Sequence, residues 1–85
     1  MMIEVCSIPN CPNCKHLKML MKSRGIPFKE TAYNPDSDDD VAEMSFRGIY
    51  NAQYPVVIVD GEKMPAMTVS GYMGIFLKLK ERGSL

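Results

Sequence analysis

The sequence predicts an α/β fold in which a four-stranded mixed sheet packs against three helices, in the order β-α-β-α-β-β-α. Two observations support this prediction. Short runs of β-branched residues alternate with segments whose apolar residues recur at helical spacing, a pattern typical of α/β proteins. Asp60-Gly61 forms a strong two-residue turn between the last two predicted strands, so these strands are expected to run antiparallel.

The first strand and the first helix are expected to meet at a pair of cysteines. Alternating β-branched residues predict a strand from Ile3 to Cys6. The helix is expected to begin at Pro12, because a first turn does not use the N–H that proline lacks, and to stop at Gly25. Cys11 would then lie near the N-cap and Cys14 in the first turn. The apolar stripe of this helix consists of Cys14, Leu17, Leu20 and Met21.

A second strand and a second helix follow. The strand is expected from Phe28 to Tyr33, and Asn34-Pro35 ends it. The helix is expected from Ser37 to Arg47, with Gly48 as its stop. Its inward-facing side chains are expected to be Val41 and Met44.

The acidic run Asp36–Asp40 at the start of this helix has a structural explanation. Ser37 and Asp40 have the spacing of a capping box, and carboxylates in a first turn complement the helix dipole. An acidic docking patch and a cation site are the alternatives.

The last three elements contain the most apolar segment of the chain. The continuous β-branched run Val56–Val59 predicts a strand buried on both faces. The segment from Glu62 to Met67 is expected to return antiparallel as an edge strand, because Pro65 cannot donate to a central ladder. An amphipathic helix then ends at Gly83, after three cations that favour a helix C-terminus. Its apolar stripe is Tyr72, Ile75, Phe76 and Leu79, and the cations are Lys78, Lys80 and Arg82.

Composition excludes several classes of protein. The chain has 85 residues, and we expect residues 1–85 to form one domain. Lys and Arg together number 10, as do Asp and Glu, so the basic excess of nucleic-acid-binding proteins is absent. No apolar run approaches the roughly 18 residues that span a bilayer, and the N-terminus lacks the pattern of a signal peptide. We therefore expect a cytoplasmic monomer with no nucleic-acid or membrane partner, in which three cysteines make a poor structural disulfide set.

Cys11 and Cys14 carry the chemistry. At the start of a helix, unpaired N–H groups and the positive end of the dipole favour thiolate over thiol, so we expect the pKa of Cys11 to lie below that of a free cysteine. Cys11 is therefore the predicted nucleophile, and Lys15, one turn further on, adds a modest cationic contribution. Cys14 lies on the apolar stripe and is expected to act second, by attacking a mixed disulfide to release the reduced substrate.

A CxxC motif is also half of a metal site, so a zinc or iron–sulfur module is the alternative. A second CxxC motif and a His pair are absent, which leaves Cys6 and His16 as the remaining soft ligands. His16 does not directly follow Cys14, so the c-type haem signature fails. Cys6 is expected to be buried and His16 partly exposed, with a regulatory oxidation site and a pH-dependent influence on Cys11 as the alternatives.

Tyr54-Pro55 stands directly before the predicted buried strand. A proline that enters a strand without a turn is a candidate for a cis peptide bond. Only about 5–6% of X–Pro bonds are cis, so the signal is weak by itself. The prediction of a cis bond becomes stronger when the same chain also contains a strand–CPxC–helix unit.

Together these motifs resemble the thioredoxin superfamily and, within it, the glutaredoxin family. The shared features are Cys11–Cys14 (CPNC) after the first strand, Gln53–Val57 (QYPVV) and Asp60-Gly61. The resemblance implies a thioredoxin-like fold, Cys11 as nucleophile, Cys14 as resolving thiol and no cofactor besides their redox-active disulfide. It also implies that the Tyr54 backbone pairs with an extended substrate segment. The substrate site that it implies consists of Pro12, Asn13, Tyr54, Pro55, Ser70, Gly71 and Tyr72.

Two departures from glutathione-binding members favour a particular branch. Ile8 occupies the place of a lysine three residues before the first cysteine, and Val69–Met73 lacks the carboxylates that hold the amino end of glutathione. The sequence is more similar to NrdH-redoxins and to compact redoxins of bacteriophages, through Gly48–Val57 and Ser70-Gly71-Tyr72. That resemblance implies protein disulfides as substrates, ribonucleotide reductase among them. It also implies thioredoxin reductase as the reductant, with glutathione as the alternative.

Overall fold

The computed structural model describes residues 1–85, and its elements follow the expected order. A four-stranded mixed sheet and three helices form the α/β fold that the sequence predicts. The elements are β1 (Ile3–Ser7), α1 (Pro12–Ser23), β2 (Lys29–Ala32), α2 (Asp38–Phe46), β3 (Val56–Val59), β4 (Glu62–Lys63) and α3 (Val69–Glu81).

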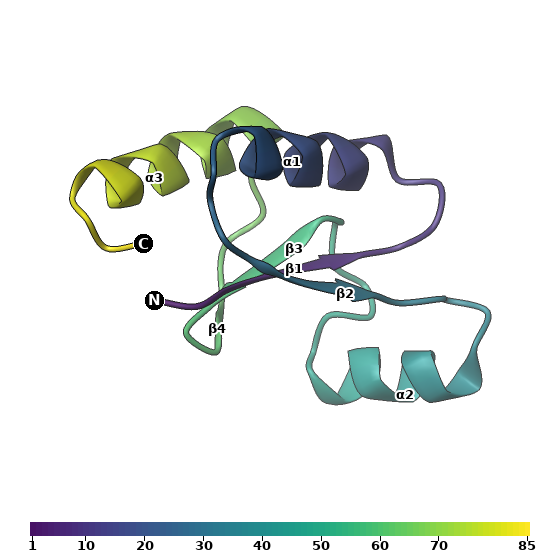
Figure 1. Ribbon diagram of the computed structural model, residues 1–85. Coiled ribbons are helices and arrows are strands. Elements are labelled where there is room, and N and C mark those ends of the chain that lie inside the picture. The colour runs from purple at the N-terminus through teal and green to yellow at the C-terminus, as the bar shows by residue number, and fades with distance from the viewer.

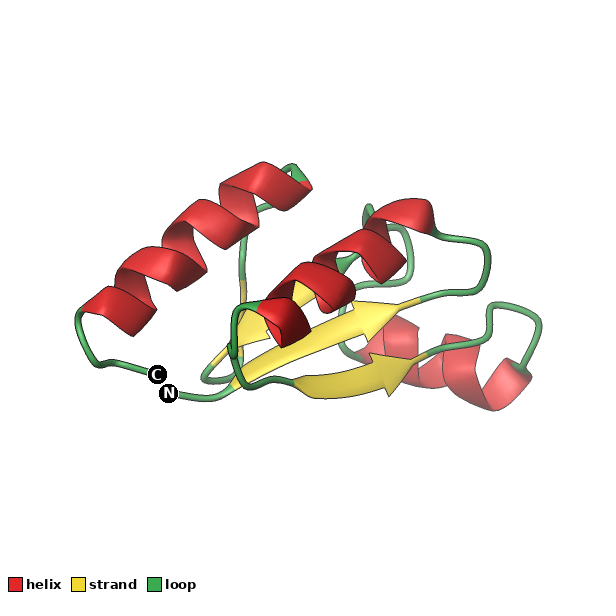
Figure 2. Cartoon of the chain, turned by 45° about the horizontal axis from the view of Figure 1, so that its top comes forward, coloured by secondary structure: helices red, strands yellow, loops and turns green.

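The strands are arranged in the order β2-β1-β3-β4. β1 runs parallel to β2 and antiparallel to β3, and β3 is antiparallel to β4. The helices α1 and α3 lie side by side on one face of the sheet, and α2 lies on the other (Figure 1). Figure 2 shows the same arrangement from a second angle, with α2 behind the sheet. The molecule therefore has three layers, with the sheet between the two helical layers. Within the sheet, β1 and β3 are the two inner strands.

Side chains of the inner strands alternate between two cores, because successive residues of a strand point to opposite faces. Ile3 and Val5 face α1 and α3, whereas Cys6 faces the side of α2. The continuous apolar run of β3 is divided in the same way, which confirms that both faces of this strand are buried. The first core contains Ile3, Val5, Leu17, Met21, Ile26, Val57, Tyr72, Met73 and Phe76, and the second contains Cys6, Tyr33, Met44, Ile49, Val56 and Ile58.

The start of α2 differs in one detail from the expected capping box. The Ser37 side chain accepts the N–H of Asp40 at 3.4 Å, as expected. The Asp40 carboxylate does not return this bond; it accepts the N–H of Asn34 at 2.8 Å and so fixes the loop before the helix. Within α2, Met44 is buried and Val41 only partly so.

The fourth strand is shorter than expected, since β4 covers only Glu62–Lys63. The Met64 N–H still donates to the Val57 carbonyl oxygen at 2.9 Å, and the next residue, Pro65, has no N–H with which to continue the ladder. The chain then crosses to the first turn of α3. No helix has the length and apolar character needed to cross a membrane.

Candidate redox site

The site is built where β1 ends and α1 begins. Cys11 is the N-cap of α1 and Pro12 its first residue, as the sequence predicts. Cys11 and Cys14 form a disulfide, with their Cα atoms 5.3 Å apart. This separation lies within the usual range for disulfides, so the backbone of one helical turn can accommodate the bond.

The two sulfur atoms have different surroundings. Cys11 Sγ accepts the backbone N–H of Cys14 at 3.2 Å, and the Cys11 side chain is partly exposed. Cys14 is only 2% exposed and packs into the protein. Pro12 and Asn13 between them are exposed. An incoming reactant therefore reaches Cys11 first, at the sulfur that points toward the free N–H groups of the helix.

The loop before β3 forms one wall of the site. The Tyr54-Pro55 peptide bond is cis, which confirms the sequence prediction, and Pro55 is buried. The carbonyl oxygen of Tyr54 lies 3.8 Å from Cys11 Sγ. The Tyr54 hydroxyl donates to the Ile49 carbonyl oxygen at 2.9 Å, and burial raises the pKa of this hydroxyl to about 12. Tyr54 therefore stays a neutral donor and fastens the loop next to the cysteines.

A groove on the other side of Cys11 completes the site. On α1, Cys11, Lys15 and Lys18 recur at helical spacing and share one face. Lys18 crosses to Glu30 on β2, with the ammonium nitrogen 2.8 Å from the carboxylate. This ion pair lowers the pKa of Glu30. The groove, of about 670 Å³, is lined by Ile8, Asn10, Cys11, Pro12, Cys14, Lys15 and Lys18.

The residues expected from the start of the last helix are not brought to this groove. Thr68 is the N-cap of α3, and its hydroxyl accepts the N–H of Gly71 at 3.1 Å. Ser70 is exposed, and no hydrogen bond joins Ser70 or Gly71 to the cysteines. Tyr72 was expected to contact the substrate. Its side chain is instead 1% exposed and packs in the first core.

The structure also contains a polar network that sequence reasoning did not find. On the α2 side of the sheet, Arg47 binds both carboxylate oxygens of Glu4, at 3.0 and 2.7 Å. The Thr31 hydroxyl donates to the same carboxylate at 2.7 Å, and Arg47 also donates to the Tyr33 hydroxyl at 2.7 Å. The hydrogen bond from Arg47 is the main reason that the pKa of Glu4 falls to about 2. The only sequence signal was the alternation in β1, which puts Glu4 on the opposite face from its apolar neighbours.

Cys6 belongs to this network rather than to the redox site. It is fully buried, as expected, and its sulfur lies 3.8 Å from both Arg47 and Glu4. The pKa of the Cys6 thiol is raised to about 11, mainly by burial. His16 is exposed on α1. No three Cys, His, Asp or Glu side chains are placed so that they could hold a metal ion together.

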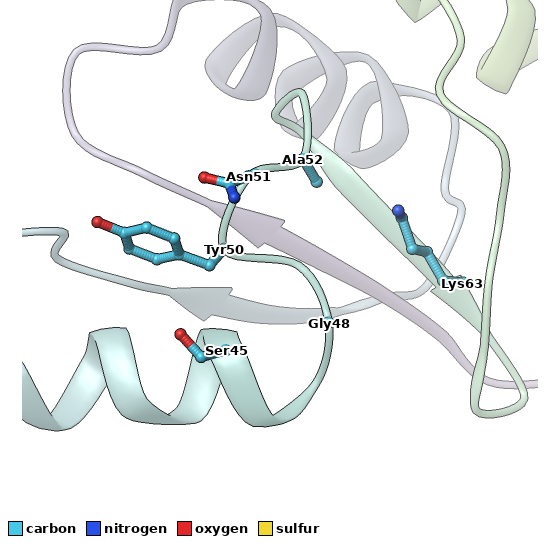
Figure 3. A pocket seen from close by; sticks show the side chains of 6 residues that line it. All are labelled: Ser45, Gly48, Tyr50, Asn51, Ala52 and Lys63. Carbon is cyan, nitrogen blue, oxygen red and sulfur yellow. The ribbon is translucent and has the colours of Figure 1, made fainter.

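A second groove lies between the C-terminal end of α2 and the loop that leads to Pro55 (Figure 3). It offers no cysteine, histidine or carboxylate. In Figure 3 the Tyr50 and Lys63 side chains stand on opposite sides of the loop and do not converge. This groove therefore lacks a convergent set of side chains for catalysis, whereas the groove beside Cys11 contains the two cysteines. Its lining is Ser45, Gly48, Tyr50, Asn51, Ala52 and Lys63.

The three-layer fold, the CxxC disulfide at a helix N-terminus and the cis-proline beside it define a thioredoxin-like protein with a redox-active disulfide. The chain belongs to the glutaredoxin family, whose sequence model matches residues 3–64. The structure is similar to the crystal structure of the thioredoxin-like protein BC3987, with a TM-score of 0.60 and 22% identity over 86% of this chain and 97% of that chain. A mutant of BC3987 gives the same TM-score and identity over 85% and 95%. At this identity the neighbours support the fold alone. No curated protein sequence matches the chain significantly.

Proposed function

We propose that this protein is a dithiol–disulfide oxidoreductase that reduces disulfides of protein substrates. The observation that carries the proposal is the position of Cys11 as the N-cap of α1, with a partly exposed sulfur that accepts the Cys14 N–H at 3.2 Å. In the reduced protein, the same N–H would form a charge-assisted hydrogen bond to a Cys11 thiolate. The helix dipole stabilises the same negative charge.

The proposed reaction has two exchange steps. The Cys11 thiolate attacks one sulfur of the substrate disulfide, which forms a mixed disulfide and releases the other substrate sulfur as a thiolate that takes up a proton. Cys14 then loses its proton and attacks Cys11 Sγ, which forms the Cys11–Cys14 disulfide and releases the second substrate thiol. Two electrons pass from the protein to the substrate. The low exposure of Cys14, 2%, keeps this thiol from competing for the first step.

Substrate contacts are proposed around the exposed sulfur. Pro12 and Asn13 are exposed beside it, and the Tyr54 carbonyl oxygen is 3.8 Å from it. A peptide bound in an extended conformation would find hydrogen-bonding backbone at Tyr54 and apolar surface at Pro12.

For the physiological reductant we propose thioredoxin reductase, and for the substrate we propose ribonucleotide reductase, as in NrdH-redoxins. The first part is supported by the absence of two charge partners that glutathione-binding members usually have: Ile8 stands where a lysine is usual, and Val69–Met73 contains no carboxylate. The second part is supported only by the resemblance to that branch. The protein is proposed to act as a monomer.

The reductase proposal is tested by reduction of insulin disulfides, with the wild-type protein and two variants. We expect turnover by the wild-type protein and by Cys6→Ala, and none by Cys11→Ser. Cys6→Ala is the matched control, because Cys6 is a buried thiol outside the site. Equal activity of Cys11→Ser and wild type would overturn the proposal.

The choice of reductant needs a separate experiment. The oxidised protein is mixed either with thioredoxin reductase and NADPH or with glutathione, glutathione reductase and NADPH, and NADPH consumption is followed. We expect faster reduction by thioredoxin reductase. Reduction by the glutathione system alone would place the protein with the glutathione-dependent members instead.

A further inference from the structure

The groove beside Cys11 has an uneven distribution of charge. Two of its lining residues, Lys15 and Lys18, are basic, and none is acidic. Lys18 is already paired with Glu30 at 2.8 Å. Lys15 is exposed and takes part in neither of the two ion pairs of the structure. An uncompensated positive charge therefore stands one helical turn away from the proposed nucleophile.

The geometry puts this charge within reach of a bound peptide. Residues four apart on a helix are neighbours, with about 5–6 Å between their Cβ atoms, so Lys15 faces the same groove as Cys11. An extended peptide advances about 3.3 Å per residue. When a substrate cysteine is joined to Cys11, side chains one or two positions along the substrate, about 3–7 Å away, are therefore within reach of the long Lys15 side chain. Ile8 and Pro12 provide apolar surface in the same groove.

We propose that Lys15 selects protein disulfides that carry Asp or Glu one or two residues from the cysteine that Cys11 attacks. This inference rests on the proposed function and names its substrate class. Lys18 contributes little to the selection, because its ammonium already has Glu30 as a partner. The exchange reaction is unchanged; the carboxylate only holds the substrate against the groove while the disulfide between Cys11 and the substrate cysteine forms.

The test uses three synthetic peptides with a single cysteine, in which the two residues on each side of the cysteine are all Asp, all Asn or all Lys. Each cysteine is activated as a mixed disulfide with thiopyridine, so attack by Cys11 joins the peptide to the protein and releases a coloured thione. The rates with reduced protein are divided by the rates with free 2-mercaptoethanol, which removes the effect of the neighbouring charge on the peptide itself. We expect the corrected Asp to Asn ratio to be about two to five, the size of an exposed ion pair, and to fall with added salt.

Two variants separate recognition from other effects of the lysine. Lys15→Gln is expected to bring the corrected ratio to one; any influence of Lys15 on the reactivity of Cys11 cancels, because both peptides report it equally. Lys78→Gln, on the exposed surface of α3, is the matched control and is expected to keep the wild-type ratio. A ratio of one in the wild-type protein, or an unchanged ratio in Lys15→Gln, overturns the inference while leaving the reductase proposal intact. If the wild-type protein reacts with no peptide faster than the Cys11→Ser variant does, the proposed function and this inference both fail.

Discussion

Cys11 Sγ lies 3.2 Å from the backbone nitrogen of Cys14, so the sulfur that caps α1 is also one end of the redox pair. A hydrogen bond from a helix N-terminus favours the thiolate, and we expect the pKa of Cys11 in the reduced protein to be below that of a free cysteine. The rate of alkylation by iodoacetamide as a function of pH, measured on Cys14→Ser, checks this, with glutathione as the reference thiol. A midpoint equal to that of glutathione would contradict the expectation.

Loss of the second cysteine should stop the reaction halfway. In Cys14→Ser, Cys11 can still attack a disulfide, but no thiol is available to release the substrate, and we expect the mixed disulfide to accumulate. Intact-mass spectrometry after mixing with a disulfide-containing protein measures the adduct. Cys11→Ser is the control and should give none; an adduct in Cys11→Ser and not in Cys14→Ser would reverse the two roles.

Cys6 should be chemically silent in the folded protein. Its thiol is fully buried and has a pKa raised to about 11, mainly by burial, so almost no thiolate exists at neutral pH. We expect the oxidised protein to resist alkylation under native conditions and to take up one label in guanidinium chloride. Labelling at the same rate with and without denaturant would show that Cys6 is accessible.

The ion pair between Glu4 and Arg47 should make stability depend on acid pH. The pKa of Glu4 is lowered from 4.5 to about 2 in the folded protein, chiefly by the hydrogen bond from Arg47. The stability that the ionised Glu4 gives to the folded protein is therefore complete above pH 4.5 and is lost as the pH falls toward 2. At pH 7 we expect Glu4→Gln to lower the free energy of unfolding by about 1–3 kcal/mol, as is typical of a lost charged hydrogen bond.

Urea unfolding of the wild-type protein and Glu4→Gln across this range measures the effect, and the difference between them should shrink at the acid end. Glu30→Gln is a useful comparison. It removes an ion pair with a 42% exposed carboxylate, which we expect to change the free energy of unfolding by less than about 1 kcal/mol. A difference for Glu4→Gln that stays constant down to pH 2 would argue against an ionised Glu4 as the cause.

Tyr54 should stabilise the site loop through its hydroxyl. Tyr54→Phe removes the hydrogen bond to the Ile49 carbonyl oxygen and leaves the ring in place, so we expect a loss of about 1 kcal/mol in the free energy of unfolding. Tyr50→Phe, in the same loop but with an exposed ring, is the control and should have little effect. Equal effects of the two substitutions on thermal or urea unfolding would show that the bond to Ile49 is not important.

Local signals predicted most of the fold and the centre of the site. Cys11 as N-cap and Pro12 in the first turn follow from residues adjacent in sequence, because helix capping and the preference of proline for a first turn are local effects. The cis bond at Pro55 had only a weak local signal, which was strengthened by the strand–CPxC–helix unit elsewhere in the chain. The Glu4–Arg47 contact joins residues 43 apart. It depends on where α2 lies relative to the sheet, which no local pattern specifies.

Tyr72 shows how two sequence arguments can disagree. The family motif suggested a substrate contact, whereas helical periodicity had already placed Tyr72 on the apolar stripe of the last helix. The structure agrees with the periodicity: the ring is buried, and its hydroxyl donates to the Pro65 carbonyl oxygen at 3.2 Å. The edge strand was expected to continue to Met67 because proline is tolerated at a sheet edge, whereas the strand stops at Lys63, before Pro65.

The second helix is attached to the sheet differently from the other two. Met44 is its only buried side chain, and Arg47, at its C-terminal end, adds the ion pair with Glu4. With so few anchors, α2 should open locally at a lower free energy than the global unfolding of the sheet, and its amides should exchange with solvent first. The loop that carries Tyr54 joins this loosely held helix to the tightly packed β3. One wall of the redox site is therefore connected to the helix that we expect to open first, whereas the cysteines lie on α1, which packs in the first core.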